Sequence, residues 1–226
     1  EPGKKIAVVG MNGSGKTTMV KLLCRLYDPD GGRVMLNGRD VREYDYEEYL
    51  RRFSVVFQDF QLLALPLGEN VAGGKDYDAA RVRDCLEKAG FGKRLQRMKD
   101  GLSTFLYRNM DQDGVEISGG EAQKIALARA LYKDAPIVVL DEPTAALDPV
   151  SEHEVYSGFR NLVGGRTAIF ISHRLSSCRF CDEILVFHQG HLVQRGSHEE
   201  LVKEKDGLSS MWRAQAQYYE LDAAVG

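Results

Sequence analysis

Two glycine-led segments carry the residue types that bind phosphate. The first is Gly10-Met11-Asn12-Gly13-Ser14-Gly15-Lys16-Thr17, which follows an apolar run over 5–9. Glycines let backbone N–H groups turn inward around a triphosphate, and the N-terminus of the next helix adds partial positive charge. At this spacing Lys16 reaches the β- and γ-phosphates and the Thr17 hydroxyl binds Mg²⁺. The sequence therefore predicts a nucleotide site made by Asn12, Gly13, Ser14, Gly15, Lys16, Thr17 and Thr18.

A pair of acidic residues, Asp141 and Glu142, follows the apolar run over 137–140. We expect that run to be a buried strand, and ligands of open α/β sheets bind at the carboxyl ends of strands. Asp141 is suited to hold Mg²⁺ through water, and Glu142 to orient or deprotonate the attacking water. A strand that ends in acidic residues is common by itself, so this prediction depends on the glycine loop.

The second glycine-led segment is Ser118-Gly119-Gly120-Glu121, at the start of an expected helix over 119–132. A local explanation exists, because Ser118 and Glu121 have the spacing of a capping box. It leaves Gly119 and Gly120 unexplained, since glycine in a first helical turn costs about 1 kcal/mol. Bare backbone at a helix start suits an anion, and one nucleotide already has its loop. This segment therefore predicts contact with the nucleotide of another copy.

The elements that must position these residues alternate between strand and helix, as in a parallel sheet covered on both faces. Between the glycine loop and the acidic pair, the stretch from Asp78 to about Lys99 is purely helical in pattern, with Asp78 as its N-cap. We interpret it as part of an inserted helical lobe. The expected strands cover 5–9, 33–36, 54–57, 137–140, 167–171 and 183–187; the expected helices cover 17–26, 46–52 and a two-helix tail that starts with a capping box at Ser197.

Composition places the chain among globular proteins: it has 226 residues, of which 43% are hydrophobic and 28% charged, with a formal net charge of -3. The negative balance argues against a duplex-binding surface, so we expect no nucleic-acid partner. No apolar run approaches the ~18 residues of a membrane span. The four cysteines form no disulfide or zinc pattern, and we expect Cys178 and Cys181 to be reduced and structural.

With these residues in place, the chain resembles the ATP-binding domain of an ABC transporter from Lys4 onward. The ordered motifs that carry the resemblance are Gly10 to Thr17 as Walker A, Gln58 as the Q-loop glutamine, Ser118 to Gln123 as the signature, Ile137 to Asp141 as Walker B, Glu142 as the catalytic glutamate, Ala145-Ala146-Leu147-Asp148 as the D-loop and His173 as the H-loop histidine. The segments around Gln58 and His173 are similar to those of exporter-type members.

The resemblance implies an α/β fold with a P-loop NTPase core, a mainly parallel sheet flanked by helices and an inserted α-helical subdomain. The catalytic lobe would cover 1–72 and 134–226, and the helical signature lobe 73–133. Glu1-Pro2-Gly3 leads straight into the first strand, so we expect this chain to be part of something longer. The resemblance implies that an upstream β-subdomain and transmembrane segments are the parts missing from it.

The resemblance also implies a mechanism and partners. Two ATPase domains, either two copies of this chain or this chain and a related one, would form a head-to-tail dimer around two Mg²⁺-ATP. Walker A and Asp148 of one domain and the signature of the other would lie at each nucleotide. Glu142 would polarise water, His173 would contact the γ-phosphate, and Gln58 would touch Mg²⁺ and water. The Gln58–Val71 segment would meet the transmembrane domain, which places the chain at the cytoplasmic face of the cell membrane as an ATPase that drives export.

Departures from the family pattern leave alternatives open. Glu121 stands where the signature usually has glutamine and puts negative charge near the partner's triphosphate. Ala145 replaces the usual serine of the D-loop, and Asp111-Gln112-Asp113-Gly114 replaces a Gly-Glu pair. A soluble ABC-type ATPase of translation or DNA repair is one alternative, although a repair protein would insert a long coiled coil. A degenerate regulatory subunit of a heteromeric transporter is the other, although such a subunit would lack Glu142 or His173.

Overall fold

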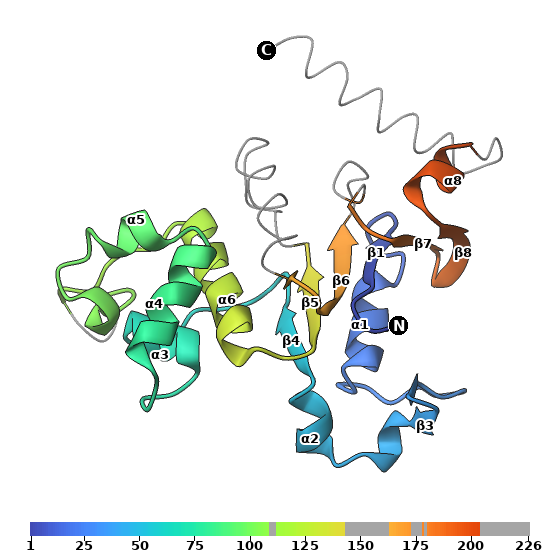
Figure 1. Cartoon of the computed structure of the whole chain (residues 1–226), viewed down its shortest axis with the longest axis horizontal. Coiled ribbons are helices and arrows are strands. Elements are labelled where there is room, and N and C mark those ends of the chain that lie inside the picture. Colours follow the sequence, from blue (N-terminus) through green and yellow to red (C-terminus); the bar gives the residue numbers. More distant parts are fainter. Residues whose placement is uncertain (109–111, 143–162, 173–177, 179, 204–226) are drawn as a thin grey trace, which may run out of the picture. The chain divides into compact units, whose positions relative to one another are not determined.

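The computed structural model describes residues 1–108, 112–142, 163–172, 178 and 180–203 (Figure 1). The chain forms two compact units. The first unit comprises Glu1–Leu50, Val139–Glu142 and Arg166–Gly226, and the second comprises Arg51–Val138 and Pro143–Gly165. Each unit is treated separately below.

The main sheet has six strands in the order β4-β5-β6-β1-β7-β8. In the first unit β1 pairs in parallel with both β6 and β7, whereas β8 is antiparallel to β7. This mainly parallel sheet confirms the predicted α/β class. Its strands are β1 (Lys5–Val9), β4 (Phe53–Val56), β5 (Ile137–Asp141), β6 (Thr167–Ser172), β7 (Glu183–His188) and β8 (His191–Gly196); β2 (Met35–Leu36) and β3 (Arg39–Asp40) form a small antiparallel sheet.

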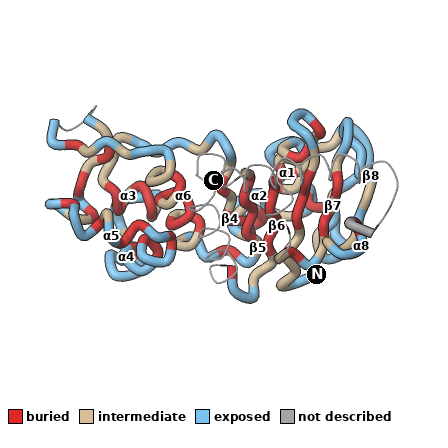
Figure 2. The backbone as a smooth tube through the Cα atoms, turned by 90° about the horizontal axis from the view of Figure 1, so that it is seen from above, coloured by how far each residue is buried: buried red, intermediate tan, exposed pale blue. Residues whose placement is uncertain are grey.

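The core of the first unit is built on β1, β6 and β7, where the buried residues concentrate (Figure 2). Val8, Ile171 and Ile184 are fully buried. Strands covered on both faces are nearly continuous apolar runs, which is why the sequence identified them well. The helices of this unit are α1 (Lys16–Leu23), α2 (Tyr46–Leu50) and α8 (His198–Lys203), with a 3-10 turn, η1, at Val41–Glu43.

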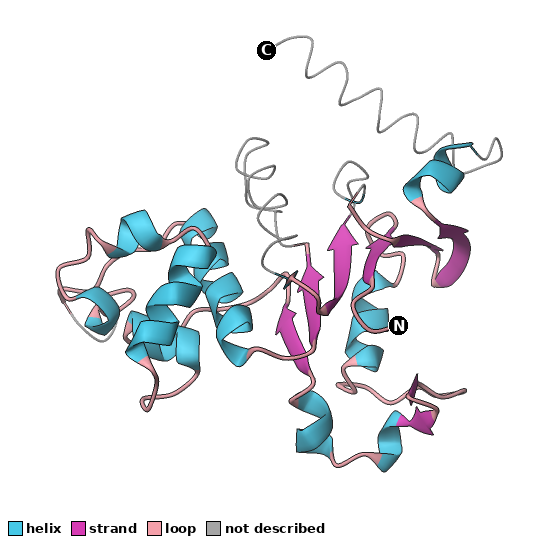
Figure 3. Cartoon of the chain, viewed as in Figure 1, coloured by secondary structure: helices cyan, strands magenta, loops and turns pink. Residues whose placement is uncertain are grey.

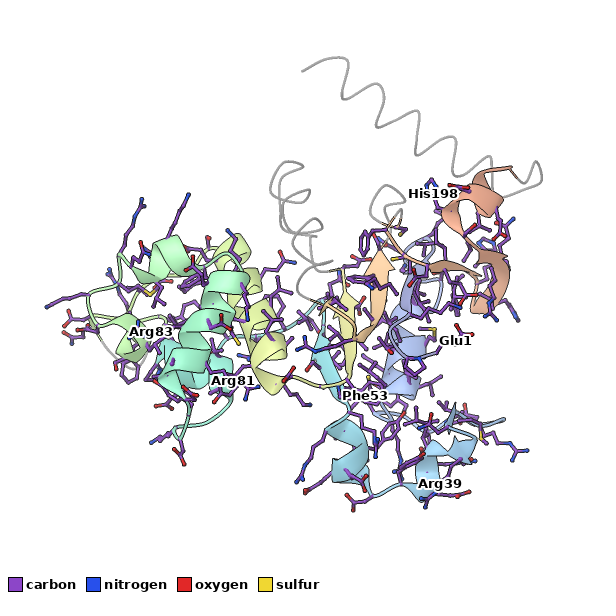
Figure 4. The ribbon with its side chains drawn as sticks, in the orientation of Figure 1. Glu1, Arg39, Phe53, Arg81, Arg83 and His198 are labelled. Carbon is purple, nitrogen blue, oxygen red and sulfur yellow. The ribbon has the colours of Figure 1, made fainter. Side chains whose placement is uncertain are left out.

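The second unit is largely helical apart from the β4 and β5 residues within it (Figure 3). Arg81, labelled in Figure 4, ties two of its helices together: it lies over the Tyr132 ring and donates to the Tyr132 carbonyl at 2.7 Å. No helix in the described part of the chain has both the length and the apolar character that crossing a membrane requires. The helices are α3 (Leu67–Ala72), α4 (Ala79–Lys88), α5 (Gly92–Leu95) and α6 (Gly119–Lys133), with a 3-10 turn, η2, at Gly101–Ser103.

The predicted helix from Asp78 to about Lys99 is wrong in its second half. Its start is correct, because the Asp78 side chain accepts from the N–H groups of Ala80 and Arg81. The helix ends at Lys88, where Gly90 has φ +76° and the N–H of Phe91 donates to the Leu86 carbonyl at 2.8 Å. A glycine in the left-handed conformation is the usual helix stop, so Gly90 was the signal that helical periodicity overrode.

Other sequence predictions have mixed outcomes. The capping box at Ser197 is confirmed, since Ser197 and Glu200 exchange backbone-to-side-chain hydrogen bonds. The helix α3 and the strand β8 were missed, and the second tail helix lies outside the described residues. All four cysteines lie among the described residues, are buried and form no disulfide there, as expected for Cys178 and Cys181. The compact second unit begins at Arg51 rather than at residue 73, and the lobe boundaries stay a prediction.

Asn70 organises the segment that precedes α3. Its side chain accepts from the Leu63 N–H at 2.9 Å and donates to the carbonyls of Leu63 and Leu65, each at 3.0 Å. Arg129 of α6 donates from Nε to the Asn70 carbonyl at 2.8 Å. Because Asn70 is only 2% exposed, these bonds replace water for backbone groups that no regular element pairs.

We predict that Asn70→Ala lowers the free energy of unfolding by about 1–3 kcal/mol, because the Leu63 N–H loses its acceptor and the carbonyls of Leu63 and Leu65 each lose one of their donors. Urea denaturation of the chain measures this change. Lys75→Ala, an exposed change just beyond α3, should stay within about 0.5 kcal/mol of the wild type. Equal effects of the two substitutions would show that the Asn70 bonds do not hold the segment.

Candidate functional site

The glycine loop after β1 is closely packed against the start of the β7–β8 hairpin. A Cβ atom at Gly10 would lie 2.3 Å from the Phe187 carbonyl oxygen, which no side chain can tolerate. Gly13 has φ +78° and Gly15 has φ +97°, in the left-handed region that favours glycine. Gly10 is therefore required because a side chain would have no room. Gly15 is required by its backbone conformation and its close neighbour, and Gly13 by its backbone conformation alone.

The sequence reasoning missed the hairpin that supports this loop. Gln189 and Gly190 both have positive φ, and they join the paired residues His188 and His191 in a two-residue turn. The Gly190 N–H donates to the Ser14 carbonyl at 3.0 Å, and a Cβ at Gly15 would lie 3.3 Å from the Gly190 Cα. The signal was present in the sequence as Gln-Gly between two runs of strand character.

Lys16 is buried at the first position of α1, with 5% of its surface exposed. Its ammonium donates to the carbonyls of Gly10 at 2.8 Å and Met11 at 3.0 Å, which uses two of its three donors. Burial lowers the pKa of Lys16, whereas the nearby carboxylates of Glu142 and Asp141 oppose that shift. The loop thus holds a cation near the acidic pair, and contact of Lys16 with a nucleotide stays a prediction.

The loop and the start of α1 fit an anion. The helix begins after Gly15 with no side-chain cap, so its first N–H groups have no side chain to satisfy them. The Ser14 hydroxyl is buried and has no hydrogen-bond partner among the described residues. A phosphate group would supply acceptors for both, which agrees with the predicted cradle.

Thr17 and Asp141 meet across the first unit: the Thr17 hydroxyl donates to Asp141 Oδ2 at 3.1 Å. Asp141 is only 2% exposed. Neighbouring ligands of an octahedral Mg²⁺ lie ~2.9 Å apart, so a hydroxyl and a carboxylate at this distance fit one ion. The two residues are 124 positions apart in sequence and meet in the fold, and their role as magnesium ligands stays a prediction.

Glu142 leaves the sheet directly after β5. Its φ of +48° is left-handed, which is uncommon for a residue other than glycine and recurs at functional sites. Its N–H still donates to the Ile171 carbonyl at 3.1 Å, one residue before β6 ends. The acidic pair therefore lies beside the carboxyl end of β6.

Three further predicted site residues, Gln58, His173 and Asp148, are not part of the described first unit. Gln58 is exposed in a turn after β4, within the second unit. His173 and Asp148 lie outside the described residues. The first unit thus assembles Lys16, Thr17, Asp141 and Glu142, and the contributions of Gln58, His173 and Asp148 stay predictions.

The second glycine-led segment begins α6 with the capping box that the sequence predicted. The Glu121 N–H donates to the Ser118 hydroxyl at 3.3 Å, and the Ser118 N–H donates to Glu121 Oε2 at 3.0 Å. Ser118 and Gly119 are exposed, while Gly120 is partly buried. The local explanation for this segment is therefore correct, and the contact with a second nucleotide stays a prediction.

Comparison with known proteins agrees with the motifs described above. A family model described as ABC transporter matches residues 1–145. An ATP-dependent lipid A-core flippase of Burkholderia orbicola (strain AU 1054) is 42% identical over 216 residues, which cover 96% of this chain and 36% of that protein. The flippase of the same name from Paraburkholderia xenovorans (strain LB400) is 42% identical over 92% of this chain and 34% of its own length.

A solved structure, titled "Structure of a bacterial Atm1-family ABC exporter with ATP bound", superposes with a TM-score of 0.86 at 36% identity. The superposition covers 95% of this chain and 37% of the exporter chain. The chain thus spans about a third of the length of these relatives. With the glycine loop, the Thr17–Asp141 contact and the family match in agreement, the chain belongs to the ABC transporter family.

Proposed function

We propose that this chain is the ATP-binding and ATP-hydrolysing engine of an ABC exporter. The observation that carries the proposal is the meeting of Thr17 and Asp141 at 3.1 Å, next to the buried ammonium of Lys16 and to Glu142. These four residues supply the functions that phosphoryl transfer needs: a phosphate-binding cation, two oxygen ligands for a metal ion and a carboxylate for water.

The roles follow from the positions of the side chains. Lys16 would donate to β- and γ-phosphate oxygens while the glycine loop surrounds the triphosphate with N–H groups. Thr17 and Asp141 would hold Mg²⁺, which offsets phosphate charge when it is bound. Glu142 would orient the attacking water and accept its proton. His173 and Gln58 would complete the site at the γ-phosphate and at the metal and water.

The working assembly that we propose is a head-to-tail dimer. Each nucleotide would bind Walker A of one copy and the exposed Ser118–Glu121 segment of the other, with Asp148 nearby. Support comes from the family match and from the similarity of this chain to a solved ABC exporter structure with ATP bound. ATP binding would close the dimer and hydrolysis would reopen it, and this cycle would drive transport.

The membrane partner would bind along Gln58–Val71. This segment exposes Leu63 at 58% and is held by Asn70 and by Arg129 of α6. A transmembrane domain that presses on it would therefore act on a segment bonded directly to the signature helix. We place the chain at the cytoplasmic face of the membrane for this reason, with its transmembrane segments outside the chain.

Export is favoured over the alternatives by the relatives' names. The two flippases resemble this chain over more than nine-tenths of its length, which favours a transport engine over a soluble ATPase. The presence of Glu142 favours hydrolysis over a purely regulatory module. The lipid in those names is the cargo of those proteins, and it indicates an amphipathic cargo for this one.

We predict that Glu142→Gln lowers the steady-state ATPase rate by about 100-fold or more, because the proton acceptor for water is lost. With ATP and Mg²⁺ the variant should accumulate as a dimer, measured by light scattering. Glu199→Gln, the same change at an exposed position of α8, should keep the wild-type rate. A Glu142→Gln protein that hydrolyses ATP normally would remove the assigned role.

We predict that Thr17→Val weakens ATP binding in Mg²⁺ by about tenfold or more, because the metal loses a hydroxyl ligand. Calorimetric titration with ATP should show this loss in Mg²⁺ but not in EDTA. Thr17→Ser keeps the hydroxyl and serves as the matched control. An equal loss with and without Mg²⁺ would mean that Thr17 acts through the fold rather than through the metal.

A further inference from the structure

The carboxylate of Glu121 has partners on both of its oxygens. Oε2 accepts from the Ser118 N–H at 3.0 Å and from the Ser118 hydroxyl at 3.1 Å. Oε1 forms an ion pair with Arg94 of α5, whose Nε lies 2.9 Å away but is not in hydrogen-bond geometry. The side chain is thus folded back onto its own helix start, and its negative charge is matched by a guanidinium of the same unit.

Arg94 reaches this position because of the chain reversal after α4. Gly90 turns the backbone, and the flanking residues Phe91 and Leu95 are buried at 1% and 8% exposure. These anchors fix α5 although it has only four residues. The guanidinium is therefore presented to the start of α6 by packing, without depending on the ion pair.

The charge balance matters because of where Glu121 stands. An uncompensated carboxylate in the first turn of α6 would repel the triphosphate that the proposed dimer brings to Ser118–Glu121. We propose that Arg94 is a positioning residue of the ATP-bound dimer: it neutralises and holds Glu121, so that this helix start accepts a triphosphate from the second copy. This inference rests on the proposed function.

The same geometry separates this role from a contribution to folding. The side chains of Arg94 and Glu121 are 37% and 28% exposed, and ion pairs at such positions add little to folding stability. The Ser118 bonds also keep the helix capped without Arg94. Loss of Arg94 should therefore change nucleotide-driven association and leave thermal unfolding close to the wild type.

The experiment measures the ATP concentration that produces half-maximal dimer, by light scattering in Mg²⁺ with Glu142→Gln as the background. Arg94→Ala should raise this concentration by about tenfold, whereas Arg94→Lys should retain most of the affinity. Adding Glu121→Gln to Arg94→Ala should restore the value of Glu121→Gln alone, because a neutral amide needs no counter-charge. ATP binding by the monomer should not change.

Arg97→Ala is the matched control, since Arg97 is exposed three residues later and forms no ion pair within the part of the chain that the structure describes. The inference is overturned if Arg94→Ala behaves like Arg97→Ala, if it tightens the dimer, or if its effect persists beside Glu121→Gln. If the background protein itself forms no dimer with ATP, the proposed function fails and the inference falls with it.

Discussion

The parallel pairing of β1 with β6 is the constraint on which the site depends. The register places Val9 beside Ser172, so both strands end at the same edge of the sheet. The Glu142 N–H bonds to Ile171, which brings the acidic pair to that edge as well. Three segments that are far apart in sequence therefore converge through backbone hydrogen bonds, and their side chains need only short reach to act together.

The glycine loop depends on a second backbone contact, with the Gln189–Gly190 turn. Gly10 and Gly15 approach this hairpin so closely that a Cβ atom would collide with it or crowd it. A loop that packs in this way has its N–H groups ordered before a nucleotide arrives, which lowers the entropic cost of binding. The antiparallel edge of the sheet thus serves the phosphate site although it carries none of its side chains.

Much of the site was predictable because its residues are consecutive or follow strands with strong patterns. Lys16, Thr17, Asp141 and Glu142 were identified from spacing alone, and the structure brings them together in one unit. The hairpin under the loop and the Arg94–Glu121 pair were not predicted. The Arg94–Glu121 pair depends on a contact between distant residues of ordinary types, so no local pattern announces it. The hairpin had a local signal in Gln189–Gly190, and only its packing against the glycine loop had none. The error beyond Lys88 had a different cause, since Gly90 gave a stop signal that periodicity outweighed.

The bond from Arg129 to the Asn70 carbonyl has a consequence for building chimeric transporters. Its donor lies on the signature helix and its acceptor in the segment proposed to meet the membrane domain, 59 residues apart in sequence. The signature helix and the proposed membrane-contact segment are therefore structurally coupled, although they belong to separate sequence motifs. A graft that exchanges only the Gln58–Val71 segment between transporters should keep an arginine at 129, or the new segment will lose the hydrogen bonds that this side chain makes to Asn70.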